Sequence, residues 1–468
     1  MAFLDEMISH INNFLWTYIL IAMLISIGVY FTFKTKFVQF RNFKEMFRLL
    51  GDSATGDKEE NSVSSFEAFC ISTASRVGTG NLAGVATAIA VGGPGAVFWM
   101  WLIALIGGAS SFIESTLAQI YKVKDGDSFR GGPAYYIEKG LKKKWMGMLF
   151  AILITICFGL VFNSVQANTI TLSLNNSFGF NKTVVGVILT ILTIVIIFGG
   201  VNRIAKVSSV LVPIMAIFYI IIALFIVVKN FSTIPSVLSM IFENAFGINE
   251  VVGGGIGAAL MQGIKRGLFS NEAGMGSAPN AAAAATVSHP VKQGFIQTLG
   301  VFTDTIIICS CTAFMILLSG APLDGSVKGI ELTQIALSNQ VGSWGGIFIS
   351  VCILLFAFSS IVGNYYYGET NIQFITDKKI YLQLYRVFVG AMVFFGSIVS
   401  MDIVWNLADV FMGLMAIVNL IAIVLLSKIA LAALEDYKNQ KKKGIKDPVF
   451  NSNSIPALRE EETEWNSI

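Results

Sequence analysis

The chain has 468 residues, of which 54% are hydrophobic and only 13% are charged, and its net charge is +3. Soluble domains carry about 25% charged residues, so this apolar excess excludes a protein whose surface faces water alone. The modest net charge says little about partners, and we expect no nucleic acid among them. A chain solvated mainly by the lipid bilayer is expected instead.

About 20 apolar residues cross the hydrocarbon core of a bilayer as a helix. The sequence predicts eleven such segments, near residues 13–34, 63–91, 95–121, 146–177, 183–200, 207–229, 251–286, 292–318, 341–367, 381–400 and 403–433. Asp5 and Glu6 stand where a signal peptide would carry Lys or Arg, so we expect the first segment to be retained. The predicted fold class is an all-α polytopic membrane protein with about 11 transmembrane helices.

The distribution of Lys and Arg predicts the orientation of these helices. The loops that follow the first and third segments are rich in both residues, which is typical of cytoplasmic loops. Alternation from there places the N-terminus outside and the C-terminus in the cytoplasm of a cell whose plasma membrane the chain crosses many times. Without the first helix, ten segments remain, and they divide into five plus five of opposite orientation, the form of an inverted repeat.

This division predicts four parts of the chain. Residues 1–62 hold the peripheral first helix and, at 38–50, a basic amphipathic segment. Residues 63–230 form the first five-helix repeat and residues 251–434 the second. Residues 435–468 form a charged cytoplasmic tail that is poor in apolar residues, so we expect it to be disordered.

Two predicted segments contain paired glycines beside polar residues. Gly78 and Gly80 interrupt the first helix of one repeat, and Gly274 and Gly276 interrupt the first helix of the other. Each glycine costs a helix about 1 kcal/mol, and irregular backbone at membrane depth survives only where it lines a cavity. The glycines could be packing notches, but two corresponding breaks predict a binding site at the midplane of the bilayer.

The ends of broken helices define the chemistry of such a site. A half-helix that stops leaves carbonyl groups for a cation or an ammonium group, and one that starts leaves N–H groups for a carboxylate. A zwitterion and a sodium ion fit these ends. Because glycine backbone approaches closely while Phe269 and Met275 fill space, we expect a small cavity that favours alanine-sized ligands.

Three motifs carry a family resemblance. They are GGPGAVFWMW at residues 92–101, GGPAYYI at residues 131–137 and GLFSNEAG at residues 267–274. With them the sequence resembles the alanine or glycine:cation symporter family, within the group that shares the LeuT-type inverted-repeat fold, over nearly the whole chain. The resemblance implies a transporter for a small neutral amino acid, with sodium as the coupling ion and no other cofactor.

The resemblance also implies site residues. The substrate pocket would be formed by both breaks together with one amide, from Ser75, Gly78, Thr79, Gly80, Gln166, Phe269, Ser270, Asn271, Gly274, Met275 and Gly276. Gln166 could instead be an amide that is hydrogen-bonded within the core. The wider superfold implies a sodium site made of the carbonyls of Ala74 and Val77 and the hydroxyls of Ser359 and Ser360.

Several charged residues lie inside predicted membrane helices, namely Arg76, Glu114, Lys265, Arg266, Glu272, Asp304 and Asp409. An unpaired charge at the midplane costs on the order of 3 kcal/mol or more, so we expect these groups to pair or to face water. Arg76 and Glu272 occupy equivalent places in the two breaks, and a salt bridge between them is our hypothesis. Arg76 also departs from the superfold pattern, which argues against a second sodium ion beside the substrate.

Three other function classes were weighed. An intramembrane enzyme is excluded because the chain has no His-Glu-x-x-His and no Gly-x-Ser-x-Gly motif. An ion or small-solute channel also needs a polar path through lipid, but channels usually build it from symmetric subunits rather than from repeats within one chain. A proton-coupled amino-acid transporter is the remaining alternative.

Overall fold

The computed structural model describes residues 2–55, 62–126, 128–198, 200–247, 255–459, 461 and 463–466. Within these ranges the chain is helical except for one antiparallel hairpin of β1 (Val123–Asp125) and β2 (Ser128–Arg130). The predicted all-α class is therefore confirmed. The starting residues 251–254 of the predicted second repeat lie outside the described residues.

The helices before the second break follow the predicted order. They are α1 (Ala2–Phe14), η1 (Leu15–Leu20), α2 (Ile21–Lys34), α3 (Val38–Arg41), α4 (Phe43–Thr55), α5 (Ser65–Arg76), η2 (Gly80–Gly84), α6 (Val85–Gly92), α7 (Ala96–Ile120), α8 (Pro133–Leu141), α9 (Lys144–Ile154), η3 (Thr155–Phe162), α10 (Asn163–Phe178), α11 (Lys182–Ile197), α12 (Gly200–Lys229), η4 (Phe231–Thr233), α13 (Ile234–Ala245) and α14 (Gly255–Asn271).

The remaining helices follow that break. They are α15 (Ala278–Ala284), α16 (Pro290–Val301), η5 (Phe302–Cys309), α17 (Ser310–Leu317), α18 (Ile330–Val341), α19 (Trp344–Ile375), α20 (Lys379–Ile398), α21 (Met401–Lys442), η6 (Ser452–Ser454) and η7 (Pro456–Leu458). Among the described residues, seven helices are long and apolar enough to cross a membrane, and Gly80–Gly92 and Lys182–Ile197 are shorter apolar helices. The number of eleven crossings stays a prediction.

The two broken helices lie side by side and run in opposite directions. Val63, just before α5, forms a bridge with Ala285, just after α15. At the other end, the Cα of Gly92 lies against the backbone of Ala258 and Ala259. The start of one broken helix therefore lies beside the end of the other, which is the arrangement that an inverted repeat requires.

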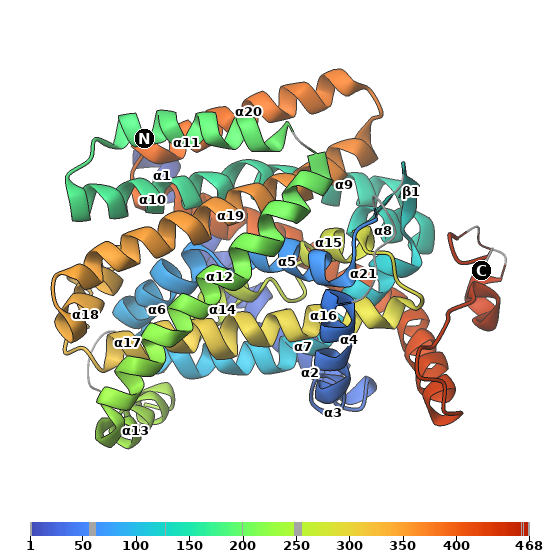
Figure 1. Cartoon of the computed structure of the whole chain (residues 1–468), viewed down its shortest axis with the longest axis horizontal. Coiled ribbons are helices and arrows are strands. Elements are labelled where there is room, and N and C mark those ends of the chain that lie inside the picture. Colours follow the sequence, from blue (N-terminus) through green and yellow to red (C-terminus); the bar gives the residue numbers. More distant parts are fainter. Residues whose placement is uncertain are drawn as a thin grey trace.

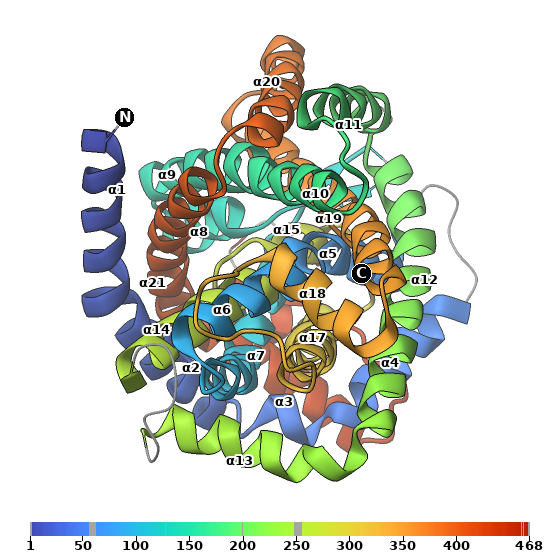
Figure 2. The same ribbon diagram turned by 90° about the vertical axis from the view of Figure 1, so that its left-hand side faces the viewer.

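The broken helices occupy the middle of the molecule. Viewed end-on, α5, α6 and α14 lie centrally, while α1, α13 and the pair of α11 and α20 lie at the periphery (Figure 2). The hairpin and α18 lie toward opposite ends of the long axis (Figure 1). Residues of the breaks are accordingly buried, with Gly78, Gly80, Gly274 and Gly276 among them.

The prediction of a disordered tail is wrong. Beyond α21 the chain folds back, and Phe450, Leu458 and Trp465 are buried. The indole Nε1 of Trp465 donates a hydrogen bond to the carbonyl of Gln119 at 2.9 Å, and its ring lies against that of Phe450. A few apolar anchors spaced among charges thus suffice to dock a segment whose composition suggested disorder.

Removing the indole tests this docking. Trp465→Ala should release the tail because it removes both the buried ring and the hydrogen bond to Gln119. Limited trypsin digestion should then cut after the exposed Arg459 faster than in the parent. Trp145→Ala, which removes a tryptophan that is 67% exposed, is the control and should leave the cleavage rate unchanged.

Candidate functional site

The first break is held open by side-chain amides. Helix α5 ends when Val77 turns to an extended conformation, with φ −79° and ψ 92°. The freed N–H of Gly78 donates to Asn81 Oδ1 at 2.9 Å, and the freed N–H of Thr79 donates to Gln166 Oε1 at 2.9 Å. The predicted pocket amide Gln166, on α10, therefore contacts the break directly.

Both glycines of the first break permit close approach. A Cβ at Gly78 would meet the hydroxyl of Ser360 and, at 2.8 Å, Gln166 Oε1. A Cβ at Gly80 would lie 3.0 Å from the ring of Phe269 and 3.2 Å from the Cα of Ser270. The structure thus brings Gly78, Gly80 and these predicted partners together, and any larger side chain at either glycine would fill the space between them.

The four residues predicted for sodium also come together. Ser359 Oγ lies 3.5 Å from the carbonyl oxygen of Ala74, and Ser360 Oγ lies 3.4 Å from that of Val77. Both hydroxyls lie closer to the carbonyl of Phe356, at 2.8 and 3.0 Å. Because a hydroxyl donates only one hydrogen, a donation to Phe356 leaves its lone pairs facing the break carbonyls. This set of hard oxygens suits an alkali cation.

A second polar contact joins the two breaks. The hydroxyl of Ser75 lies 2.8 Å from Glu272 Oε1 and 2.7 Å from Asn364 Oδ1. Ser277 donates to the other carboxylate oxygen of Glu272 at 2.6 Å. Glu272 has φ 58°, a left-handed conformation that ends α14. Ser75 and Glu272 are thus neighbours, as a shared pocket requires.

The predicted salt bridge between Arg76 and Glu272 is not present among the described residues. Arg76 points toward α16, where its Nη1 lies 3.5 Å from the carbonyl of Gln297, and its Nε and Nη2 have no hydrogen-bond partner. The carboxylate of Glu272 is already bound by two hydroxyls. Equivalent positions in the two repeats therefore do not place these side chains face to face.

The second break binds a carboxylate of the protein itself. Glu114, on α7, accepts from the N–H groups of Gly274 at 3.0 Å and Gly276 at 3.1 Å, and from Asn419 Nδ2 at 2.7 Å. The expectation that these N–H groups are free for a substrate is therefore wrong for Gly274 and Gly276. With φ of +82° and +86°, both glycines adopt a conformation that other residues rarely reach, and the Cα of Gly276 faces Phe150 rather than the first break.

Two predicted charges find one shared partner. Asp409, on α21, accepts from Lys265 Nζ at 2.9 Å and from Arg266 Nη2 at 2.7 Å, and all three are buried. The guanidinium of Arg266 also lies 4.5 Å from the ring centroid of Trp405. This network lies directly after the N-terminal part of α14 and leaves no isolated positive charge there.

Asp304 has only neutral partners among the described residues. Its carboxylate accepts from Asn81 Nδ2 and Ser270 Oγ, each at 2.7 Å, and from Thr305 Oγ1 at 2.8 Å. Asn81 belongs to the first break and Ser270 to the second. Asp304 thus links the two breaks through one buried carboxylate.

Aromatic rings close one side of the site. The ring centroid of Phe269 lies 4.6 Å from that of Phe162 and 4.8 Å from that of Trp405. Met275 is fully buried. Asn271 accepts from the N–H of Ala273 through Oδ1, and its Nδ2 has no partner. Phe269 therefore lies at the junction of the breaks, whereas nothing recorded for Met275 joins it to the first break.

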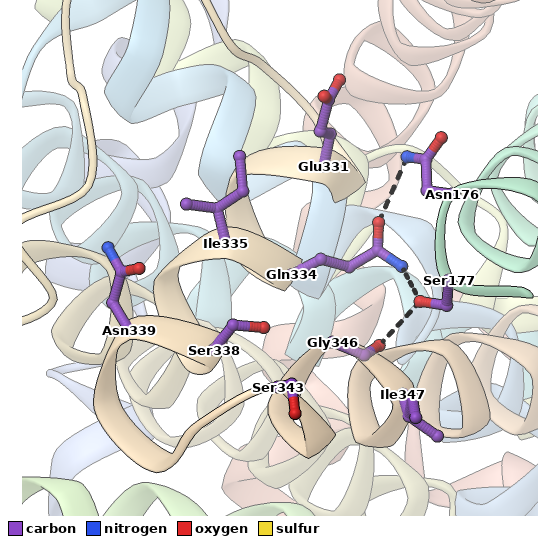
Figure 3. Close-up of a pocket in the computed structure, with 10 residues that line it drawn as sticks. All are labelled: Asn176, Ser177, Glu331, Gln334, Ile335, Ser338, Asn339, Ser343, Gly346 and Ile347. Atoms are coloured by element: carbon purple, nitrogen blue, oxygen red, sulfur yellow. Dashed lines mark hydrogen bonds between the residues drawn. The ribbon is translucent and has the colours of Figure 1, made fainter.

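A polar cavity of about 580 Å³ lies away from the breaks, between α10, α18 and α19 (Figure 3). Its central amide is Gln334, whose Nε2 donates to Ser177 Oγ at 2.9 Å and to Ser350 Oγ at 2.8 Å, while Asn176 donates to its Oε1 at 3.2 Å. These bonds join three helices. The predicted orientation puts this cavity on the outer side of the membrane.

Sequence reasoning missed several site residues. Asn364 lies four residues after Ser360, on the same face of α19, so helical spacing could have found it. Asn81 is part of the quoted first-break sequence and could have been included. Glu114 and Trp405 are distant in the sequence from both breaks, and no local pattern points to them.

The comparisons with known proteins cover the whole site. The model of the sodium:alanine symporter family matches residues 1–452. The chain belongs to this family. The symporter is 58% identical to the probable sodium/glutamine symporter GlnT of Bacillus subtilis, over 96% of this chain and 93% of that protein. It is 57% identical to the amino-acid carrier protein AlsT of the same organism, over 99% and 98%.

Solved structures support the fold. The symporter resembles MhsT in complex with L-phenylalanine, with a TM-score of 0.60 and 18% identity over 81% of this chain and 93% of that one. Its structural neighbours are transporters with the LeuT fold, so the predicted superfold is confirmed. The symporter is a multi-pass secondary transporter of a sodium-coupled family and not an enzyme.

The Lys265, Arg266 and Asp409 network can be tested by neutralising its acid. Asp409→Asn leaves two buried cations without a counter-charge, which should destabilise the symporter by about 3–5 kcal/mol. Thermal unfolding in detergent measures this loss. Asp402→Asn is the matched control, because its partner pair with Lys328 has side chains that are 71% and 46% exposed. The control should change stability by less than about 1 kcal/mol.

Proposed function

We propose that this chain imports a small neutral amino acid, alanine or glycine, together with sodium across the plasma membrane. The observation that carries the proposal is the pairing of Ala74 and Val77 carbonyls with Ser359 and Ser360 hydroxyls directly beside the first break. The predicted orientation, with the N-terminus outside and the C-terminus in the cytoplasm, belongs to this proposal.

The cation and the substrate would meet at one segment of backbone. Ala74 and Val77 belong to the end of α5, and the next residues, Gly78 and Thr79, form the break itself. A cation that fixes these carbonyls also fixes the orientation of the following N–H groups. Each ligand should therefore raise the affinity for the other by the same factor.

Sodium can supply the driving force for accumulation. One positive charge that enters across about 100 mV contributes roughly 2.3 kcal/mol. A tenfold sodium gradient adds about 1.4 kcal/mol. Together they sustain an accumulation of several hundredfold for a neutral substrate, by the relation of about 1.4 kcal/mol for each factor of ten.

The size of the substrate follows from the close contacts of the first break. Gly78 lies against Gln166 and Ser360, and Gly80 lies against Phe269, so little space remains beyond a methyl-sized side chain. The relative named for glutamine supplies the competing possibility. Competition between labelled alanine and unlabelled glycine, glutamine and leucine separates these substrates, and we expect glycine to compete best.

Removing both hydroxyls tests the sodium site. The double variant Ser359→Ala with Ser360→Ala should raise the sodium concentration for half-maximal uptake in liposomes and lower alanine affinity at fixed sodium. This defect should shrink as sodium is raised.

Ser397→Ala provides the matched control, since this buried serine on α20 donates to the Val393 carbonyl of its own helix at 2.8 Å, away from the breaks. It should retain the sodium dependence of the parent. An unchanged sodium dependence in the double variant would place the ion elsewhere and make Asp304 the next residue to examine.

Gln166 tests the substrate site. Gln166→Ala removes the acceptor for the Thr79 N–H and should weaken alanine binding by about 1–3 kcal/mol. Asn168→Ala, on the same helix, removes an amide that binds the carbonyls of Gly396 and Val399 and should leave alanine affinity unchanged. Equal losses of thermal stability without a specific binding defect in Gln166→Ala would assign Gln166 to the core.

A further inference from the structure

A small polar cavity lies between the β-hairpin and the last turns of α19, far from the cavity beside α18 (Figure 1). Its volume is about 190 Å³, and the residues that bear on its chemistry are Asp125, Ser128, Arg130, Tyr366, Glu369 and Thr370. It contains side chains of both charges, which the cavity beside α18 does not. Its volume is on the scale of one amino acid rather than of a large solute.

Three buried polar atoms at this cavity have no hydrogen-bond partner. They are Glu369 Oε2, Thr370 Oγ1 and Arg130 Nε. Glu369 is 6% exposed and Thr370 is 1% exposed. A buried polar atom without a partner costs free energy, so two acceptors and one donor at one cavity indicate a polar ligand that completes them.

The charges of the cavity are balanced, but the guanidinium of Arg130 is not hydrogen-bonded. Its nitrogens lie 3.7 Å from Asp125 Oδ1 and 3.8 Å from Asp377 Oδ1, beyond hydrogen-bond distance. Glu369 uses only Oε1 to accept from Arg386, at 3.3 Å. A ligand with a net charge would upset this balance, whereas a zwitterion would not.

We propose that this cavity is a second binding site for a zwitterionic α-amino acid. The ligand carboxylate binds the guanidinium of Arg130, whose planar fork suits a carboxylate. The ligand ammonium group binds the free oxygen of Glu369 and the hydroxyl of Thr370. The identification of the ligand as the transported amino acid rests on the proposed function.

The cavity is connected to the transport machinery. Gly131, directly after β2, packs against Ala283 of α15, the second half of the second broken helix. Tyr135 donates to the carbonyl of Thr370 at 3.1 Å, which joins α8 to α19. With the predicted orientation the site faces the cytoplasm. An amino acid bound there holds the hairpin, α15 and α19 together, so internal substrate slows transport.

Binding without sodium isolates this site. In a choline buffer the sodium-coupled site is weak, so equilibrium dialysis of labelled alanine against the purified full chain reports the second site. Arg130→Gln and the nearly isosteric Thr370→Val should each weaken this binding about tenfold or more. Lys144→Gln, at a lysine whose side chain is 77% exposed, should not. Acetate and methylamine, each half of the ligand, should compete poorly.

The same variants give a transport readout. In proteoliposomes preloaded with alanine, the parent should be slowed, and Arg130→Gln and Thr370→Val should not. The variant with both Ser359→Ala and Ser360→Ala should lose sodium-dependent binding and keep binding in choline. Absence of binding in choline by the folded parent, or unchanged binding in both cavity variants, overturns the second site. Loss of sodium-dependent alanine binding by the parent instead overturns the proposed function.

Discussion

A helix interrupted inside a bilayer has to satisfy its free backbone groups from within the protein, because lipid offers no hydrogen bonds. The rest of this structure depends on that constraint. Asn81 and Gln166 bind the N–H groups of the first break, and Glu114 binds those of the second. The carbonyls of Ala74 and Val77 face only hydroxyl groups at 3.4 to 3.5 Å, so they remain open to a cation. The division between satisfied and open groups selects what the site can bind.

Burial of charge imposes the second requirement. Asp409 neutralises two cations from neighbouring positions of α14, and Glu369 pairs with Arg386. Asp304 and Glu272 instead rely on hydroxyl and amide donors. Charges near the surface of the core are thus paired with charges, whereas the carboxylates beside the breaks are held by neutral groups that can reorient when a ligand arrives.

The sequence predicted the features that depend on local chemistry. Paired glycines marked both breaks, and the spacing of Ser359 and Ser360 placed the hydroxyls that face the first break. It could not predict which side chains meet across helices. Arg76 and Glu272 occupy equivalent places but point to different neighbours, and Glu114 reaches the second break from α7. The tail was misjudged because composition averages over the few apolar residues, such as Trp465, that anchor it.

Glu114 has a mechanical consequence. It lies on α7, in the first five-helix half, yet its carboxylate holds the backbone of the second half at Gly274 and Gly276. The two broken helices are also joined by Asp304 through Asn81 and Ser270. The boundary between the sequence halves is therefore not a hinge. Both broken helices and α7 form one rigid body, and alternating access requires the remaining helices, α10 and α19 among them, to slide or tilt around it.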